Sequence, residues 1–227
     1  MVNRGISRRA SDLTFLVAQI LVVGMCATAA AASPPPYPKD IVPPFVSVES
    51  VSQGAWSVRW WQWAASFLPD ESPVADLTGR LCANGQEGPV WFLAGTYESR
   101  LVTRACTVPR GRYLFFPIIN YVVAPRANGT LTCSEAMSSA REMTDDPSIL
   151  VAEIDGVKLE HLRQYRQASP RCFDLALRAK NDMSINTTAA NGYYLMLAPL
   201  PPGRHTLRFG GRLPALTQAV SYILTVE

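Results

Sequence analysis

The sequence has few charged residues, only two histidines and none of the short motifs that mark common nucleotide and cofactor sites. Charged residues make up 17% of the 227 residues, and the histidines are His161 and His205. Neither a Gly-x-Ser-x-Gly nucleophile turn nor a glycine-rich phosphate loop ending in Gly-Lys occurs. No Cys-x-x-Cys pair exists, so the spacing of the ligand-type residues predicts no metal site, and we expect no cofactor.

The chain also lacks the strong positive charge that is typical of nucleic-acid-binding proteins. Its formal net charge is +3, and residues 1–32 contribute three Arg and one Asp to it, so the rest of the chain carries +1. A nearly neutral domain offers little electrostatic attraction to phosphate backbones. We therefore expect no nucleic-acid partner.

The first 32 residues have the pattern of a cleavable signal peptide. Three arginines precede an apolar run over residues 13–25, and four alanines follow at residues 29–32. The run is shorter than the ~20 residues that span a bilayer, although a retained membrane anchor is the alternative. The pattern predicts cleavage after Ala30 or Ala32 and a secreted or periplasmic protein. No second long apolar run follows, so we expect no membrane span after cleavage.

Four cysteines remain beyond the predicted signal peptide, and an even number in an exported chain indicates disulfides. Four cysteines allow three pairings, and the sequence alone does not choose among them. The consecutive pairs are favoured because each flanks predicted strands: Cys82 with Cys106, and Cys133 with Cys172.

A proline-rich lead-in over residues 33–48 precedes a single predicted domain over residues 49–227. Six prolines in residues 33–44 favour an extended, semi-rigid segment. Ser52 is a suitable N-cap for a helix that ends before Pro69, and one face of that helix carries Trp56, Trp60, Trp63 and Phe67. A second helix begins at a capping-box pattern, Thr132-Cys-Ser-Glu135, and extends to about Met143.

The remaining pattern predicts a mainly β fold, namely a two-sheet β-sandwich with one or two helical insertions and disulfide links. Asp155-Gly156 is the strongest hairpin signal in the chain. Short apolar runs bounded by turn residues predict strands at 89–96, 101–108, 112–119, 149–154, 157–159, 172–177, 193–197, 204–209 and 219–226.

Several segments have an unusual composition and a fixed order. They are Trp-Trp-Gln-Trp, Asp-x-Thr-Gly-x-x-Cys, Gly-Gln-x-Gly-Pro-Val-Trp-Phe-Leu-Ala-Gly-Thr, Cys-Thr-Val-Pro, Phe-Phe-Pro-x-x-Asn and Pro-Pro-Gly-x-His-Thr, at residues 60–63, 76–82, 85–96, 106–109, 115–120 and 201–206. In this order they resemble a family of exported bacterial proteins of unknown activity. The resemblance covers most of the chain beyond the predicted signal peptide. It implies secretion and a shared fold, and it brings no activity with it.

Four side chains are candidates for contact with a ligand. Trp61 lies off the tryptophan stripe of the first predicted helix, so it is either partly exposed or packed on a second surface. Trp91 could add a second ring for stacking on a sugar, although tryptophans in such patterns are also ordinary core residues. Gln86 lies in a glycine-rich loop and Asn120 follows an apolar strand, where polar groups often orient ligands.

Three titratable side chains are candidates for proton transfer: Asp76, Glu87 and His205. Two carboxyl groups that meet in a cleft would suit acid–base work on a glycosidic bond. Each residue also has a structural explanation. Asp76-Leu-Thr-Gly79 is good turn chemistry, and a lone histidine at the start of a strand is usually a hydrogen-bonded strand residue.

These patterns lead to three hypotheses. The first is an exported β-sandwich that binds an extracytoplasmic ligand, in particular a glycan, through aromatic and amide side chains. The second is a hydrolase or lyase that acts on an extracellular polymer. The third is a structural or protein-interaction module tethered by the proline-rich lead-in.

Overall fold

The computed structural model describes residues 38–126, 129–179 and 184–227. The chain divides into two units, residues 1–35 and 36–227, and all described residues belong to the second. The predicted signal peptide and the first part of the proline-rich lead-in lie outside the described residues. No helix in the described part of the chain is long and apolar enough to cross a membrane.

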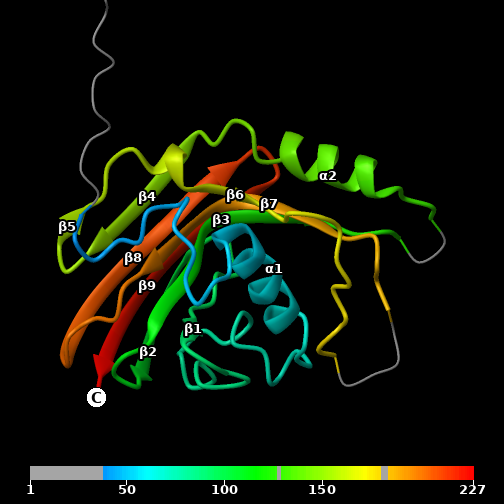
Figure 1. Ribbon diagram of the computed structural model, residues 1–227. Helices are drawn as coiled ribbons and strands as arrows, with labels where there is room; N and C mark the ends of the chain where they lie inside the picture. Colours follow the sequence, from blue (N-terminus) through cyan, green and yellow to red (C-terminus); the bar gives the residue numbers. More distant parts are fainter. Residues whose placement is uncertain (1–37, 127–128, 180–183) are drawn as a thin grey trace, which may run out of the picture. The chain divides into compact units, whose positions relative to one another are not determined.

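The first of two sheets has four strands in the order β1-β3-β7-β6 (Figure 1). Its two central strands, β3 and β7, are antiparallel, and β1 runs parallel to β3 at the edge. The strands are β1 (Val90–Phe92), β3 (Tyr113–Val123), β6 (Arg166–Ala168) and β7 (Ala189–Leu197). Every residue of β7 is buried, because both faces of this sheet are covered.

The second sheet has five strands in the order β2-β9-β8-β4-β5. Its edge strand β2 runs parallel to β9, and the other neighbours are antiparallel. The strands are β2 (Leu101–Val108), β4 (Ile149–Ile154), β5 (Val157–Lys158), β8 (Gly203–Leu213) and β9 (Leu216–Val226). Strictly alternating burial along β2 shows that one face of this sheet is buried and the other is exposed.

The main core lies between the two sheets, which confirms the predicted two-sheet β-sandwich. Inward-facing residues of β3 and β7, such as Phe116 and Leu195, belong to the same apolar cluster as Phe209 and Tyr222 of the second sheet. The rings of Phe116 and Phe209 lie 4.5 Å apart between centroids. Alternation of apolar and polar residues in β2, β8 and β9 directs one set of side chains into this core.

Helix α1 (Gln53–Ala64) covers the other face of the four-stranded sheet. Ser52 is its N-cap, as predicted, and accepts a hydrogen bond from Ala55 N at 3.2 Å. The tryptophan stripe Trp56, Trp60 and Trp63 is buried against the sheet in a second apolar cluster. The helix ends at Ala64, before the predicted end, so Phe67 packs on Trp63 from the following turn.

Helix α2 (Cys133–Glu142) begins at the predicted capping box, with Thr132 as its N-cap and Glu135 closing the box. A 3-10 helix, η1 (Leu162–Tyr165), precedes β6. The disulfides join Cys82 to Cys106 and Cys133 to Cys172, as predicted from the order of the cysteines. Cys106 points into the main core, whereas Cys133 is exposed.

One predicted strand does not form, and one observed strand was not predicted. The predicted strand at 172–177 does not form, and only an isolated bridge joins Phe173 to Thr188. The short strand β6 had no recognisable pattern. The predicted strands on either side of the turn at 109–111 both form, as β2 and β3, and they belong to different sheets.

Candidate functional site

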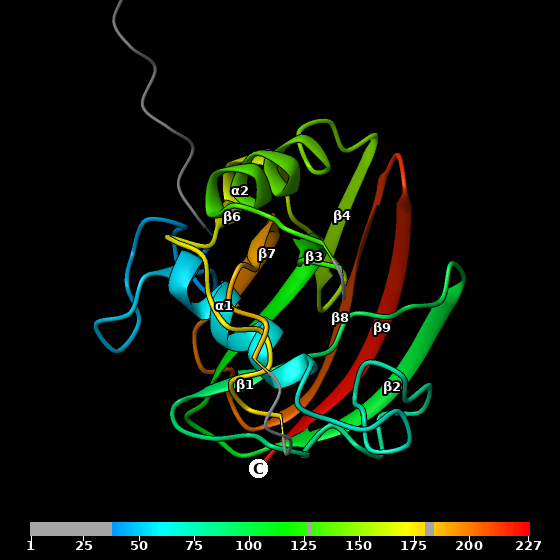
Figure 2. The same ribbon diagram turned by 90° about the vertical axis from the view of Figure 1, so that its right-hand side faces the viewer.

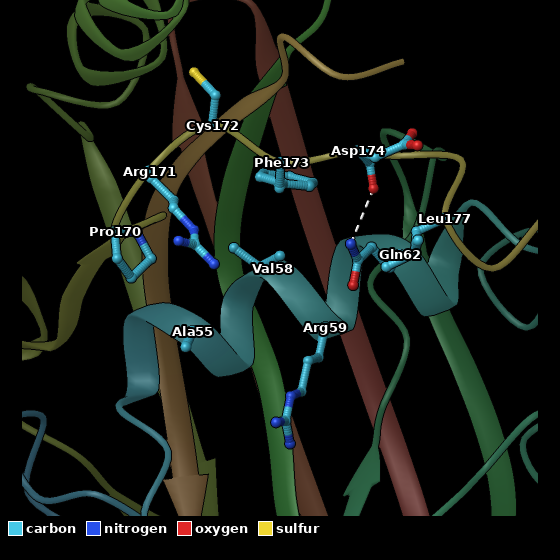
Figure 3. Close-up of a pocket in the computed structure, with 10 residues that line it drawn as sticks. All are labelled: Ala55, Val58, Arg59, Gln62, Pro170, Arg171, Cys172, Phe173, Asp174 and Leu177. Atoms are coloured by element: carbon cyan, nitrogen blue, oxygen red, sulfur yellow. Dashed lines mark hydrogen bonds between the residues drawn. The ribbon is translucent and has the colours of Figure 1, made fainter. Parts of the chain in front are cut away.

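The candidate site is a groove between helix α1 and the segment 170–177. The buried tryptophan stripe turns the opposite face of α1 toward this segment, and that face carries Val58, Arg59 and Gln62. The groove has a volume of about 570 Å³. Figure 3 shows the helix on one side of it and the segment on the other.

The segment 170–177 is held in place by contacts on both sides of the groove. Cys172 is joined by its disulfide to Cys133 at the first turn of α2. Backbone hydrogen bonds of 2.9 and 3.2 Å pair Phe173 with Thr188. Gln62 Nε2 donates to the Asp174 carbonyl at 2.9 Å, so α1 is fastened to the segment directly (Figure 3).

The Asp174 carboxylate bonds within its own loop. It accepts hydrogen bonds from the backbone N–H groups of Ala176 and Ile185 at 2.9 and 2.8 Å, and from the Ser184 hydroxyl at 2.8 Å. The Ile185 N–H and the Ser184 hydroxyl lower the pKa of Asp174 below its ordinary value. This carboxylate therefore stays ionised and orders the loop.

Two arginines supply the positive charge of the groove. Arg171 extends from the segment toward Val58, whereas Arg59 extends from the other side of α1 (Figure 3). Arg59 also lies over the ring of Trp56, with 4.5 Å between the guanidinium carbon and the ring centroid. Neither arginine has an ion-pair partner among the described residues. Apolar surface beside them comes from Val58, Phe173 and Leu177.

A second hollow of about 530 Å³ lies beside the groove, and Arg59 lines both. Glu87 and Arg178 form an ion pair of 3.1 Å in this hollow. Trp56 and Phe92 supply apolar wall. Three arginines line the two hollows around α1: Arg59, Arg171 and Arg178. Two carboxylates line them as well. Asp174 is hydrogen-bonded to backbone N–H groups, and Glu87 is paired with Arg178.

Two of the four predicted ligand contacts, Trp61 and Asn120, meet at one buried hydroxyl. Trp61 Nε1 and Asn120 Nδ2 each donate to the hydroxyl oxygen of Tyr194 at 3.1 Å. Burial raises the pKa of Tyr194, so this hydroxyl keeps its proton. Trp61 is half-buried and stands edge-on to Trp60, with 5.1 Å between ring centroids, while Asn120 is buried.

The other two predicted contacts, Gln86 and Trp91, lie at strand β1. The Gln86 side chain accepts from Phe92 N at 2.9 Å and donates to the carbonyls of Phe92 and Cys82 at 2.8 and 2.9 Å. It thus completes the backbone pairing of the edge strand. Trp91 is 8% exposed, faces the core between the sheets, and its Nε1 has no hydrogen-bond partner among the described residues.

The three candidates for proton transfer have separate partners in separate elements. Asp76 accepts from Thr78 and Leu81 within its own turn, and these hydrogen bonds outweigh burial and lower its pKa. Glu87 pairs with Arg178 and is 74% exposed. His205 bonds to Asp155. No hydrogen bond or ion pair joins any two of the three in the described part of the chain, and the described residues contain no group of three or more metal-ligating side chains.

Sequence reasoning missed the arginines Arg59 and Arg171. Arg59 carried a usable signal, because it follows Trp56 by three residues and so lies within reach of its ring on a helix. Arg171 carried none, because its segment reaches α1 only through contacts between residues far apart in the chain, such as the hydrogen bond from Gln62 to the Asp174 carbonyl. Comparison with protein-family models, curated proteins and solved structures finds no match to this chain.

Proposed function

We propose that this protein is an exported binding protein that holds an acidic glycan in the groove beside α1. The observation that carries the proposal is that Arg59 and Arg171, which have no ion-pair partner among the described residues, both line one groove with apolar walls, Arg171 from the segment 170–177 and Arg59 from α1. Guanidinium groups bind carboxylates and sulfates through paired hydrogen bonds, and apolar side chains pack on the carbon face of a sugar ring.

The way in which the groove is built also favours binding. The disulfide Cys133–Cys172, the Gln62 hydrogen bond and the Asp174 turn hold one wall before any ligand arrives. A wall that is already ordered loses little conformational entropy on binding. Export is supported by the predicted signal peptide and by the two disulfides, which persist in oxidising compartments.

The hydrolase hypothesis has less support, because its acid–base pair is not assembled. Glu87 is the only one of its three candidate residues that lines the hollows around α1. Retaining and inverting glycosidases need a second carboxyl group at roughly 5–10 Å. The nearest charged contact of Glu87 is a guanidinium group, Arg178.

The proposal is tested on a glycan array with the oxidised mature protein and matched neutral and acidic glycans. Arg171→Ala and Arg59→Ala are each expected to weaken binding of the acidic glycans about tenfold or more, the usual loss for one charged hydrogen bond. Arg110→Ala, an exposed arginine far along the chain, is the matched control and should leave binding unchanged.

Two results would contradict the proposal. If neutral glycans bind as tightly as acidic ones, the arginines do not recognise the charge of the ligand. Unchanged binding in both arginine variants would move the ligand to another surface. Cleavage of a bound glycan that is lost in Glu87→Gln would instead favour the hydrolase hypothesis.

A further inference from the structure

The five-stranded sheet and α1 lie on opposite sides of the sandwich (Figure 2). The outer face of this sheet carries a second groove. One row of residues in register crosses it: Leu101 of β2, Ala219 of β9, Gly210 of β8 and Val151 of β4. The two central residues are small and the two outer ones are branched aliphatics. The row therefore forms a trough, with a volume of about 440 Å³.

The walls of the trough are apolar and exposed. Leu101 is 60% exposed on one side, and Val151 and Ile149 are 47% and 45% exposed on the other. They are separated by three strand spacings of about 4.8 Å, which leaves room for one extended chain between them. These branched aliphatic side chains expose hydrocarbon surface to water, and a ligand in the trough would cover that surface.

The charge of this face is positive. Arg208 and Arg212 stand on β8 two residues before and after Gly210, so they bracket the floor along the strand. Arg208 lies 4.0 Å from Glu153, while Arg212 has no ion-pair partner among the described residues. Arg204 on the same strand and Lys158 of β5 add further positive charge to the face.

These features together select one kind of occupant. A second copy of the chain would bring these arginines against each other. A peptide strand has no free backbone edge to pair with, because β8 and β9 are interior strands. Phe209, the aromatic residue that lines the trough, is 2% exposed and packs its ring in the main core, so this ring is not presented to a sugar. A membrane surface requires apolar groups that protrude, whereas these line a hollow.

We propose that this trough is a binding site for a free single-chain carboxylate, such as a fatty acid. Its hydrocarbon chain would lie on Gly210 and Ala219 between the aliphatic walls, and its carboxylate would bond to Arg212 or Arg208. This site is independent of the groove beside α1 and of the acidic glycan proposed for that groove.

The test uses calorimetric titration of the full mature protein with dodecanoate below its micellar concentration. Dodecyl maltoside, with the same chain and a neutral head, is expected to bind at least about tenfold more weakly, because it lacks a charged partner for the arginines. Val151→Asp, at an exposed wall position, and Ala219→Phe, which fills the floor, are each expected to abolish dodecanoate binding. Arg212→Ala is expected to weaken it about tenfold.

Two controls separate this site from the others. Arg204→Ala removes a charge from the same strand but outside the trough, and Arg171→Ala alters the groove beside α1; both should bind dodecanoate like the unmodified protein. The proposal is overturned if dodecyl maltoside binds as tightly as dodecanoate, if Val151→Asp retains full affinity, or if binding occurs only to vesicles of anionic phospholipid.

Discussion

Arg104 is a buried cation, 1% exposed, whose hydrogen bonds go to neutral oxygen atoms. It reaches from β2 into the loops that precede β1 and β2, and so ties both to the sheet. The five bonds, of 2.7 to 3.2 Å, go to the carbonyls of Asp76, Ala94, Gly95 and Val74 and to the Tyr222 hydroxyl. Since no ligand can reach these atoms, we assign Arg104 a role in stability.

Replacing Arg104 with methionine should destabilise the protein strongly. The apolar side chain fills similar space, but it leaves several buried carbonyl groups without donors, and each such group costs about 1–3 kcal/mol. We expect the free energy of unfolding to fall by about 3 kcal/mol or more, which lowers Tm by roughly 6–12 °C in a domain of this size. Thermal unfolding followed by circular dichroism measures the change. The control Arg100→Met removes only an exposed ion pair with Glu98, and an equal loss of Tm in both variants would contradict the assignment.

At the scale of elements, His205 fastens the β4–β5 turn to the start of β8. Its Nδ1 lies 2.8 Å from Asp155 Oδ2, and its Nε2 lies 2.9 Å from the Pro201 carbonyl. Both ring nitrogens therefore face acceptors, which only the protonated ring can satisfy. Burial opposes this charge, but the hydrogen bonds to Asp155 and Pro201 outweigh it and raise the pKa of His205.

This arrangement predicts a loss of stability as the pH rises. The pKa of His205 is higher in the folded state than in the unfolded chain, where it is about 6.5. His205 therefore adds its full share to the free energy of unfolding below about pH 6.5, and this share disappears as the pH rises through the folded-state pKa. The pKa of Asp155 is lowered despite burial, so its contribution is present above about 3.9 and is lost in stronger acid. Between pH 6 and 8 the Tm of the unmodified protein should fall by roughly 1–3 °C more than that of His205→Gln. Parallel pH profiles of the two proteins would contradict this role.

The two disulfides should differ in their rate of reduction. Cys133 is exposed at the start of α2, whereas Cys106 is 5% exposed and faces the main core. Thiol–disulfide exchange requires access to a sulfur atom, so dithiothreitol should open Cys133–Cys172 first. Alkylation followed by mass spectrometry of the peptides reports the order. If Cys82–Cys106 is reduced first in the folded protein, the prediction is wrong. If glycan binding is lost when Cys133–Cys172 is reduced, this disulfide holds the wall of the groove.

At the scale of the whole molecule, the sequence pattern makes a prediction about processing. Signal peptidase requires small residues before the cut, so the predicted cleavage leaves a mature chain that begins at Ala31 or Ser33. Intact-mass measurement of the protein from the periplasm or the medium gives the first residue directly. A chain that retains residues 1–32 in the membrane fraction would favour the membrane anchor instead.

Local patterns in the sequence determined most of the elements. The N-cap Ser52, the capping box at Thr132 and the hairpin at Asp155-Gly156 were all predictable, because each depends on residues within one turn of each other. The tryptophan stripe also determined which face of α1 is buried. The structure has the disulfide pairing that the order of the cysteines favoured, although three pairings were open.

The segment 172–177 shows where local patterns fail. Its composition predicted a strand, but a disulfide and the bonds of Asp174 hold it as an irregular wall. Trp61 and Asn120 were singled out as separate ligand contacts, and only the fold joins them through Tyr194. Such contacts link residues far apart in the chain, and no sequence period encodes them.

The sequence by itself thus determined the two α-helices, most of the strands and the two-sheet class, because these depend on local spacing and on the alternation of buried and exposed residues. Only the tertiary structure decided that β2 lies parallel to β9, that Arg59 and Arg171 share a groove, and that a trough crosses the second sheet. Sheet order and register arise from the packing of distant strands against a common core, and both grooves exist only where those distant strands and segments meet.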